Sequence, residues 1–237
     1  MSLLEVDGLR VGYGFPVLMG VSFAIEEGET AVMFGLNGAG KTTTVATVAG
    51  LLRPEAGTIR FDGVDITKAS AAERVAMGIA LVPEGRRVFP ELSVANNLRL
   101  GAWTKRRHHK EIEESRQLCF SYFPRLAERS EQMAGTLSGG EQQMLAIARA
   151  LVTRPAVLLV DEMSAGLAPV VTESLIAGLQ QVNERGASLL LVEQSPRLIA
   201  HMVDRLYLLE QGRIVRSGTV DEVGGADAIA ELYLGVK

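Results

Sequence analysis

The chain has 237 residues, a formal net charge of −4 and 47% hydrophobic residues, which is enough for one sizeable core. The acidic balance argues against general binding to nucleic acid, and a single cysteine, Cys119, excludes an intrachain disulfide and fits a reducing compartment. No apolar run approaches the ~18 residues that span a bilayer, and the first residues lack a signal-peptide pattern, so we expect a cytoplasmic protein.

The first part of the sequence predicts strands and turns. Leu3–Val11 and Val21–Ile25 alternate apolar and polar residues, as half-buried strands do. Thr58–Phe61 followed by Asp62-Gly63 is typical of a hairpin. We expect these strands to form an antiparallel edge of the sheet that carries the next motif.

A phosphate-binding loop occupies Gly35–Thr43, which fits the pattern G-x-x-x-x-G-K-[ST]. It follows an apolar run of strand length, Thr30–Phe34, and precedes a helical segment, Lys41–Ala49. Such a loop turns backbone N–H groups towards phosphate oxygens, and the helix N-terminus adds partial positive charge. Lys41 is expected to contact the β- and γ-phosphates, and the Thr42 hydroxyl to ligate Mg²⁺. The predicted nucleotide contacts in this phosphate loop are Gly35, Leu36, Asn37, Gly38, Ala39, Gly40, Lys41, Thr42 and Thr43.

The middle of the chain turns from strand to helix. A capping box, Ser70–Glu73, starts a short helix, and the strand Ile79–Val82 leads into a loop, Pro83–Pro90. The pattern is then mostly helical, and we expect Ser93–Ala150 to form a helical lobe inserted into the α/β core. Its basic run, Lys105–Lys110, is interpreted as a solvated face, with attraction to lipid headgroups as the weaker alternative.

A second motif, Leu137–Gln143, lies at the head of a predicted helix that runs to Leu151. Ser138 and Glu141 have capping-box spacing, and Gly139-Gly140 leave backbone N–H groups open beside the Ser138 hydroxyl. This arrangement predicts an outward-facing anion site. The alternative is a helix cap alone, which would leave the two glycines unexplained.

A third motif, Val157–Glu162, is an apolar strand that ends in two carboxylates. Asp161 is the predicted Mg²⁺ ligand, and Glu162 is the predicted general base for the water that attacks the γ-phosphate. The alternative is a strand that simply ends at the surface in charged residues. Further on, the pattern predicts a helix, a strand, a hairpin and a helical tail, at Pro169–Glu184, Ala187–Val192, Arg205–Arg216 and Thr219–Leu234.

The order of the three motifs resembles that of ATP-binding-cassette (ABC) ATPases, over almost the whole chain. The resemblance implies one α/β domain over residues 1–237 with the P-loop NTPase fold of ABC ATPases. Residues 1–92 and 151–237 would form a mixed-sheet core with an antiparallel β subdomain, and residues 93–150 the helical lobe. It also implies ATP hydrolysis with ATP and Mg²⁺.

The resemblance assigns further roles. The signature segment would close over the nucleotide of a partner subunit through Leu137, Ser138, Gly139, Gly140 and Glu141. Tyr13 would stack on adenine, with a core-packing tyrosine as the alternative. Ser164–Leu167, here called the cross-dimer loop, matches a loop that communicates between subunits, although Met163 replaces the usual proline before it.

Two departures narrow the resemblance. Glu84 stands where the family has a glutamine that contacts Mg²⁺ and the membrane subunit, so it is a further predicted Mg²⁺ ligand. Gln194 stands where the family has a histidine that contacts the γ-phosphate, so it is a predicted catalytic residue beside Glu162. The stretches Val82–Phe89 and Val192–Gln194 together resemble the LivF type of branched-chain amino acid importers, whose features urea and short-amide importers share.

The resemblance implies a second ABC ATPase, two membrane-spanning permease subunits and, indirectly, a solute-binding protein as partners, on the inner face of the plasma membrane. No nucleic acid is expected. Two other functions stay open: a soluble ABC ATPase that acts on DNA or ribosomes, and a module that senses ATP without hydrolysing it. Glu162 argues against the second of these.

Overall fold

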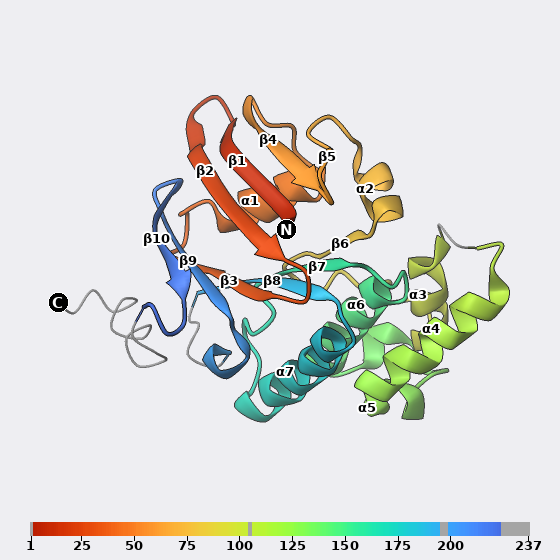
Figure 1. Cartoon of the computed structure of the whole chain (residues 1–237). Coiled ribbons are helices and arrows are strands. Elements are labelled where there is room, and N and C mark those ends of the chain that lie inside the picture. The colour runs from red at the N-terminus through yellow and green to blue at the C-terminus, as the bar shows by residue number, and fades with distance from the viewer. Residues whose placement is uncertain (1, 104–105, 195–198, 224–237) are drawn as a thin grey trace.

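The computed structural model describes residues 2–103, 106–194 and 199–223 (Figure 1). The strands are β1 (Ser2–Gly12), β2 (Pro16–Glu26), β3 (Thr30–Phe34), β4 (Ala56–Phe61), β5 (Val64–Asp65), β6 (Ile79–Val82), β7 (Val157–Asp161), β8 (Ser188–Glu193), β9 (Arg205–Glu210) and β10 (Arg213–Thr219). The helices are α1 (Lys41–Val48), α2 (Ala71–Met77), α3 (Val94–Gly101), α4 (His109–Tyr122), α5 (Pro124–Glu128), α6 (Gly139–Leu151) and α7 (Pro169–Glu184).

The strands form two sheets that lie on either side of α1 (Figure 1). One sheet has the order β2-β1-β4-β5 with antiparallel pairs. The other has the order β10-β9-β3-β8-β7-β6, in which only β10 and β9 pair antiparallel. The expected antiparallel edge is therefore a separate sheet. Alternating strands such as β1 bury one face only, so they form an outer layer instead of joining the doubly covered central sheet.

The central strands are buried at every residue of β3, β7 and β8. Their side chains alternate between two cores, as the period of a strand requires. Val32 and Phe34 pack with the helices of the lobe and α7, whereas Ala31 and Met33 pack with α1 and the antiparallel sheet. The parallel strands β3, β8 and β7 end at one sheet edge, where the phosphate loop and both carboxylates follow.

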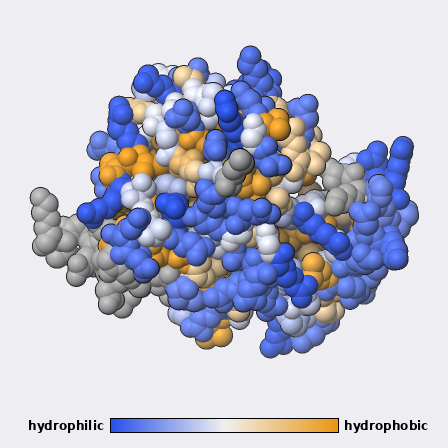
Figure 2. Space-filling view, in the orientation of Figure 1, coloured by the Kyte–Doolittle hydropathy of each residue, from blue (hydrophilic) through white to orange (hydrophobic). Residues whose placement is uncertain are grey.

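The predicted capping box of α2 is confirmed, since Ser70 pairs with Glu73, and Gly78 ends this helix in a left-handed conformation. The sequence also predicted α7, and Ser93 caps α3. Hydrophilic residues cover the lobe side in Figure 2, and α4 begins within the basic run. Lys105 and residues 224–234 of the predicted tail lie outside the described residues, and the lobe boundaries stay a prediction.

Among the described residues, no helix is both long enough and apolar enough to cross a membrane.

Candidate functional site

The phosphate loop joins β3 to α1, as predicted. A side chain at Gly35 would bring its Cβ within 2.1 Å of the Leu209 carbonyl oxygen on β9, so this position has no room for one. Gly40 caps α1 with φ of 107°, a left-handed conformation that glycine adopts without steric cost. Glycine is therefore required at Gly35 by close backbone packing and at Gly40 by the left-handed backbone conformation.

Lys41 is folded into this loop. Its side chain is 4% exposed, and Nζ donates hydrogen bonds to the carbonyl oxygens of Gly35 at 2.8 Å and Leu36 at 3.2 Å. The same ammonium lies 3.8 Å from Glu162 Oε1. A full positive charge is thus placed inside the loop, where phosphate oxygens can replace the two carbonyl partners.

Asp161 ends β7 and is 2% exposed. Burial raises its pKa to about 6, and the hydrogen bond from Thr42 opposes that rise. Among the described residues, its Oδ1 has no hydrogen-bond partner. A buried, unpartnered carboxylate oxygen beside a threonine hydroxyl fits a divalent cation that also takes phosphate and water oxygens, as Mg²⁺ does. The described residues hold no group of three or more His, Cys, Asp or Glu side chains suited to a metal, so protein ligands alone would not form the site.

Glu162 is held by two neighbours. Its backbone N–H donates to the Val192 carbonyl oxygen at 2.9 Å, and its φ is 48°. Gln194 Nε2 lies 3.2 Å from Oε1 and 3.1 Å from Oε2 of its carboxylate. The structure therefore brings together Lys41, Glu162 and Gln194 from three separate segments. The Gln194 amide points to the Glu162 carboxylate, and its contact with a γ-phosphate stays a prediction.

One cleft of about 530 Å³ collects most of the predicted nucleotide contacts. It is lined by Tyr13, Phe15, Val17, Asn37, Gly38, Gly40, Lys41, Thr42, Thr43, Glu84, Glu162 and Gln194. Tyr13 is 54% exposed on the turn between β1 and β2, so the core-packing alternative is wrong. Phe15, 66% exposed on the same turn, was missed; a second aromatic beside Gly14 was the available signal.

The signature segment lies at the head of α6 and does not line this cleft. Its capping box is confirmed: Glu141 N–H donates to Ser138 Oγ at 3.3 Å, and Ser138 N–H donates to Glu141 Oε2 at 2.9 Å. A Cβ on Gly140 would lie 2.2 Å from Val171 Cγ1, and one on Gly139 would lie 2.8 Å from the Arg86 guanidinium. Close packing therefore explains Gly140, whereas the Arg86 side chain beside Gly139 could move aside, and Leu137 just before the helix is buried.

The loop after β6 connects the cleft to the helical lobe. Glu84 lines the cleft, and the next three residues have left-handed φ values. Arg86 then packs on the signature segment, which the sequence had not indicated. Asn97 of α3 holds the far end of the loop, since its side chain accepts from Phe89 N–H at 2.9 Å and donates to the Phe89 carbonyl at 3.0 Å.

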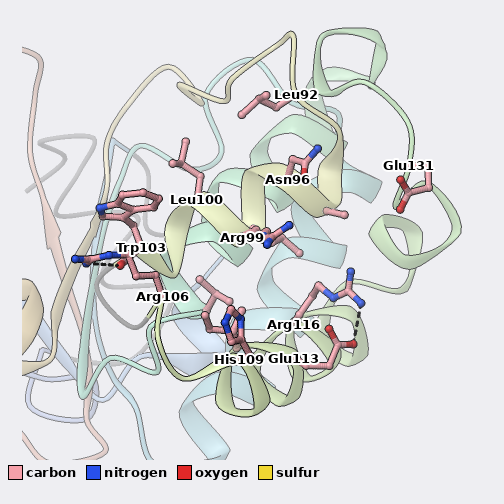
Figure 3. Close-up of a pocket in the computed structure, with 14 residues that line it drawn as sticks. Leu92, Asn96, Arg99, Leu100, Trp103, Arg106, His109, Glu113, Arg116 and Glu131 are labelled. Atoms are coloured by element: carbon pink, nitrogen blue, oxygen red, sulfur yellow. Dashed lines mark hydrogen bonds and ion pairs between the residues drawn. The ribbon is translucent and has the colours of Figure 1, made fainter.

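A larger cavity, of about 730 Å³, lies away from the nucleotide cleft, on the lobe between α3 and α4 (Figure 3). Trp103 at its edge is 62% exposed, with the Arg106 guanidinium 5.2 Å from its ring centroid. Arg116 donates to Glu113 at 2.7 Å on another wall. Leu92, at the end of the loop that begins beside Glu84, also lines this cavity.

The sequence and the fold of this chain are similar to those of known ATP-binding proteins of transporters. Residues 18–165 match the family model described as ABC transporter. The chain is 39% identical over 234 residues to the "High-affinity branched-chain amino acid transport ATP-binding protein BraG" of Pseudomonas aeruginosa, covering 98% of this chain and 100% of that protein. It is 32% identical over 236 residues to the "Probable branched-chain amino acid transport ATP-binding protein LivF" of Archaeoglobus fulgidus, covering 99% of each. A solved ATP-binding cassette of an ABC transporter in its ADP conformation is 25% identical, with a TM-score of 0.85 and coverage of 100% of this chain and 96% of that one.

Proposed function

The chain belongs to the ABC transporter family of ATP-binding subunits, and from that premise we propose that it hydrolyses ATP to drive uptake of branched-chain or similar small amino acids. The observation that carries the proposal is the single cleft in which the phosphate loop, Glu162 and Gln194 meet. The names of the BraG and LivF relatives support the substrate class. A related importer of urea or short amides stays the alternative.

In this proposal, adenine stacks on the exposed Tyr13, with Phe15 beside it, and the phosphates occupy the phosphate loop. Lys41 Nζ then exchanges its two carbonyl partners for phosphate oxygens. The similar fold of an ATP-binding cassette solved in its ADP conformation supports nucleotide binding by this chain. Thr42 and Asp161 would hold Mg²⁺, with Glu84 near them, and the ion would screen the phosphate charge.

Glu162 is the proposed base. It accepts the proton of the water that attacks the γ-phosphorus, and the bond from that phosphorus to the bridging oxygen breaks to leave ADP. The Gln194 amide fixes the direction of the carboxylate by bonding both of its oxygens. Since Gln194 cannot titrate like histidine, we expect the site that uses this chain's Gln194 to turn over more slowly than a histidine-containing one.

A second ATPase is proposed to complete the site. The signature segment lies outside this chain's own cleft, at a helix start suited to an anion. It would close on the ATP of the partner, while the partner's corresponding segment closes on the ATP held here. Pseudomonas aeruginosa has both a BraG and a BraF protein among the relatives, at 39% and 29% identity, which supports two different ATPases.

The cavity on the helical lobe is the proposed contact for a permease subunit (Figure 3). It presents an exposed aromatic ring, Trp103, among arginine side chains. Leu92, which lines the lobe cavity, lies at the end of the loop that begins at Glu84 in the cleft. A movement of this loop at the cleft would therefore displace residues at the permease contact. The chain would then act on the cytoplasmic face of the plasma membrane, and a solute-binding protein would act through the permeases.

Affinity purification of the chain from detergent-solubilised native membranes tests this function. We expect two membrane-spanning subunits and a second ATPase with histidine at the Gln194 position to co-purify. Trp103→Ala should release the permeases, whereas Val64→Ala, an equally exposed apolar residue on β5, should not. Recovery of ribosomal or DNA-associated proteins without permeases would instead favour the soluble ABC ATPase.

A further inference from the structure

A buried carboxyl group that the proposed reaction does not use lies at the end of β8. Glu193 is 3% exposed and is absent from the lining of the nucleotide cleft. Its Oε2 accepts a hydrogen bond from Ser164 Oγ at 2.7 Å, and its Oε1 accepts one from Ser164 N–H at 3.2 Å. Burial raises the pKa of Glu193 to about 7, and the hydrogen bonds from Ser164 oppose that rise. A group this costly to bury is retained with both oxygens directed at one residue.

Ser164 is the first residue of the cross-dimer loop. The loop closes as a tight turn, in which Leu167 N–H donates to the Ser164 carbonyl oxygen at 3.2 Å. Ala165 and Gly166 at its tip are exposed, whereas Met163 just before it is 1% exposed. The tip is therefore free to meet another chain, and its position depends on how its first residue is fastened.

Three successive residues around the end of β8, Val192 to Gln194, form hydrogen bonds with residues that follow β7. The Val192 carbonyl accepts from Glu162 N–H, Glu193 holds Ser164, and Gln194 holds the Glu162 carboxylate. Gln194, just past the end of β8, lines the cleft, whereas Glu193 contacts the loop. The base and the cross-dimer loop are thus set by adjacent side chains of one segment.

We propose that Glu193 is a positioning residue that holds the cross-dimer loop in register with the base Glu162. The inference rests on the proposed function, because it takes Glu162 as the base and the loop as a contact with the second ATPase. If the loop shifts, the partner subunit meets a displaced surface, and closure around ATP no longer places the attacking water correctly. Turnover should therefore fall while the affinity of this chain for ATP stays unchanged.

The test compares Glu193→Gln, Ser164→Ala and the double variant in the complex purified from native membranes. Each single change should lower ATP turnover at saturating ATP by about tenfold, and the double variant should be no slower, because both remove one interaction. Glu193→Gln keeps the side-chain volume but leaves one acceptor oxygen, and Ser164 is only half-buried, so both variants should fold.

Two matched controls separate positioning from folding. Glu29→Gln changes a mostly buried carboxylate that bonds Arg205 at 2.8 Å, and Ser188→Ala removes a buried hydroxyl from the other end of β8. Both should leave turnover per folded site unchanged, whatever they do to the melting temperature. Unchanged turnover in Glu193→Gln and Ser164→Ala, or fully additive losses, would overturn the inference.

Glu162→Gln is measured beside them. If it abolishes this site's turnover and the Glu193 variants behave like the wild type, only the positioning role fails. If Glu162→Gln itself turns over normally, the proposed catalytic assignment fails, and the role of Glu193 falls with it.

Discussion

The nucleotide cleft and the signature segment differ in how much of their chemistry one chain supplies. In the cleft, the Glu162 carboxylate lies 3.8 Å from Lys41 Nζ and accepts hydrogen bonds from the Gln194 amide, so one chain supplies all three groups of the proposed catalytic site. In the signature segment, the Ser138 hydroxyl and the Glu141 carboxylate cap their own helix, and Glu141 also forms an ion pair with Arg129. In the proposed function, the cleft binds ATP with groups from this chain alone, whereas the signature segment acts on nucleotide that another chain holds.

The pKa values of carboxyl groups shift in opposite directions in the signature segment and at the strand ends. The pKa of Glu141 is lowered: burial acts to raise it, but hydrogen bonds from Ser138 and the charge of Arg129 outweigh that effect. Arg129 Nε lies 2.7 Å from Glu141 Oε1. At the strand ends, burial dominates and the pKa values of Asp161 and Glu193 are raised. The cap therefore favours a charged carboxylate, whereas the strand ends hold carboxyls that are costly to ionise.

Glu162→Gln should produce the largest change, because it removes the base from the cleft and leaves the signature segment intact. We expect turnover to fall by about 10²- to 10⁴-fold. Binding of an ATP analogue should stay near the wild-type affinity, because Lys41 and the phosphate loop are unchanged. Phosphate release and analogue titration measure the two effects, and normal turnover would remove Glu162 from its assigned role.

Stability should depend on pH through Glu193. Its pKa is about 7 in the folded protein against 4.5 for the ordinary group, so the folded state binds the proton more tightly. This contribution is fully present below pH 4.5 and is lost as pH rises to 7, at a cost of up to about 3 kcal/mol. Glu193→Gln should flatten the free energy of unfolding over this range, as denaturant titrations would measure. A profile parallel to that of the wild type would contradict the assignment.

Lys41→Ala should weaken ATP binding by about 30-fold, since it removes a charge-assisted contact to phosphate. The effect belongs to this chain's cleft alone and should need no partner. Lys68→Ala, an exposed lysine beyond β5, is the matched control and should bind ATP normally. Equal affinity in both variants would show that the loop does not hold the phosphates as proposed.

Gly140→Ala tests the other region. Its Cβ would overlap Val171 Cγ1, and such overpacking displaces the start of α6. We expect about a tenfold loss of turnover in the assembled complex, with no loss of ATP affinity in this chain. Val171→Ala should restore part of the rate by making room. A loss of ATP binding like that of Lys41→Ala would contradict the separation of the two regions.

Gln194→His should have the smallest effect, a few-fold rise in the turnover of the complex, because histidine restores a titratable group beside Glu162. Initial rates of phosphate release at saturating ATP measure it. An unchanged rate would show that Gln194 does not slow this site.

Much of the fold could be predicted from the sequence because the patterns that specify its helices and strands lie within short stretches of the chain. The period of β1, the apolar runs of β3 and β7, and the caps at Ser70 and Ser138 each specify an element without distant contacts. The phosphate loop and the strand-end carboxylates were likewise predicted by spacing. The antiparallel β subdomain was predicted by the family resemblance, whereas the strand patterns alone placed these strands at an edge of the central sheet, because such patterns do not say which strands become neighbours.

The missed site residues depend on contacts between distant segments. The Arg86 side chain lies beside Gly139, although the two residues are 53 positions apart in the chain (139 minus 86). No pattern in either stretch of sequence predicts that contact. The hydrogen bonds from Ser164 to Glu193 and from Gln194 to Glu162 arise only because β7 and β8 are neighbours in the sheet. Sequence patterns therefore predict the residues that carry chemistry, but they do not predict the residues that hold these side chains in position.

In the proposed mechanism, the signature segment of another chain covers the ATP that is bound in this chain's cleft. Sedimentation of the Glu162→Gln chain, mixed with the second ATPase that co-purifies with it, tests this most directly. Mg²⁺-ATP should convert the two chains into a stable pair, and Lys41→Ala or Gly140→Ala in the same background should prevent that conversion. ATP bound tightly with no change in mass, or pairing that ignores both substitutions, would contradict the account.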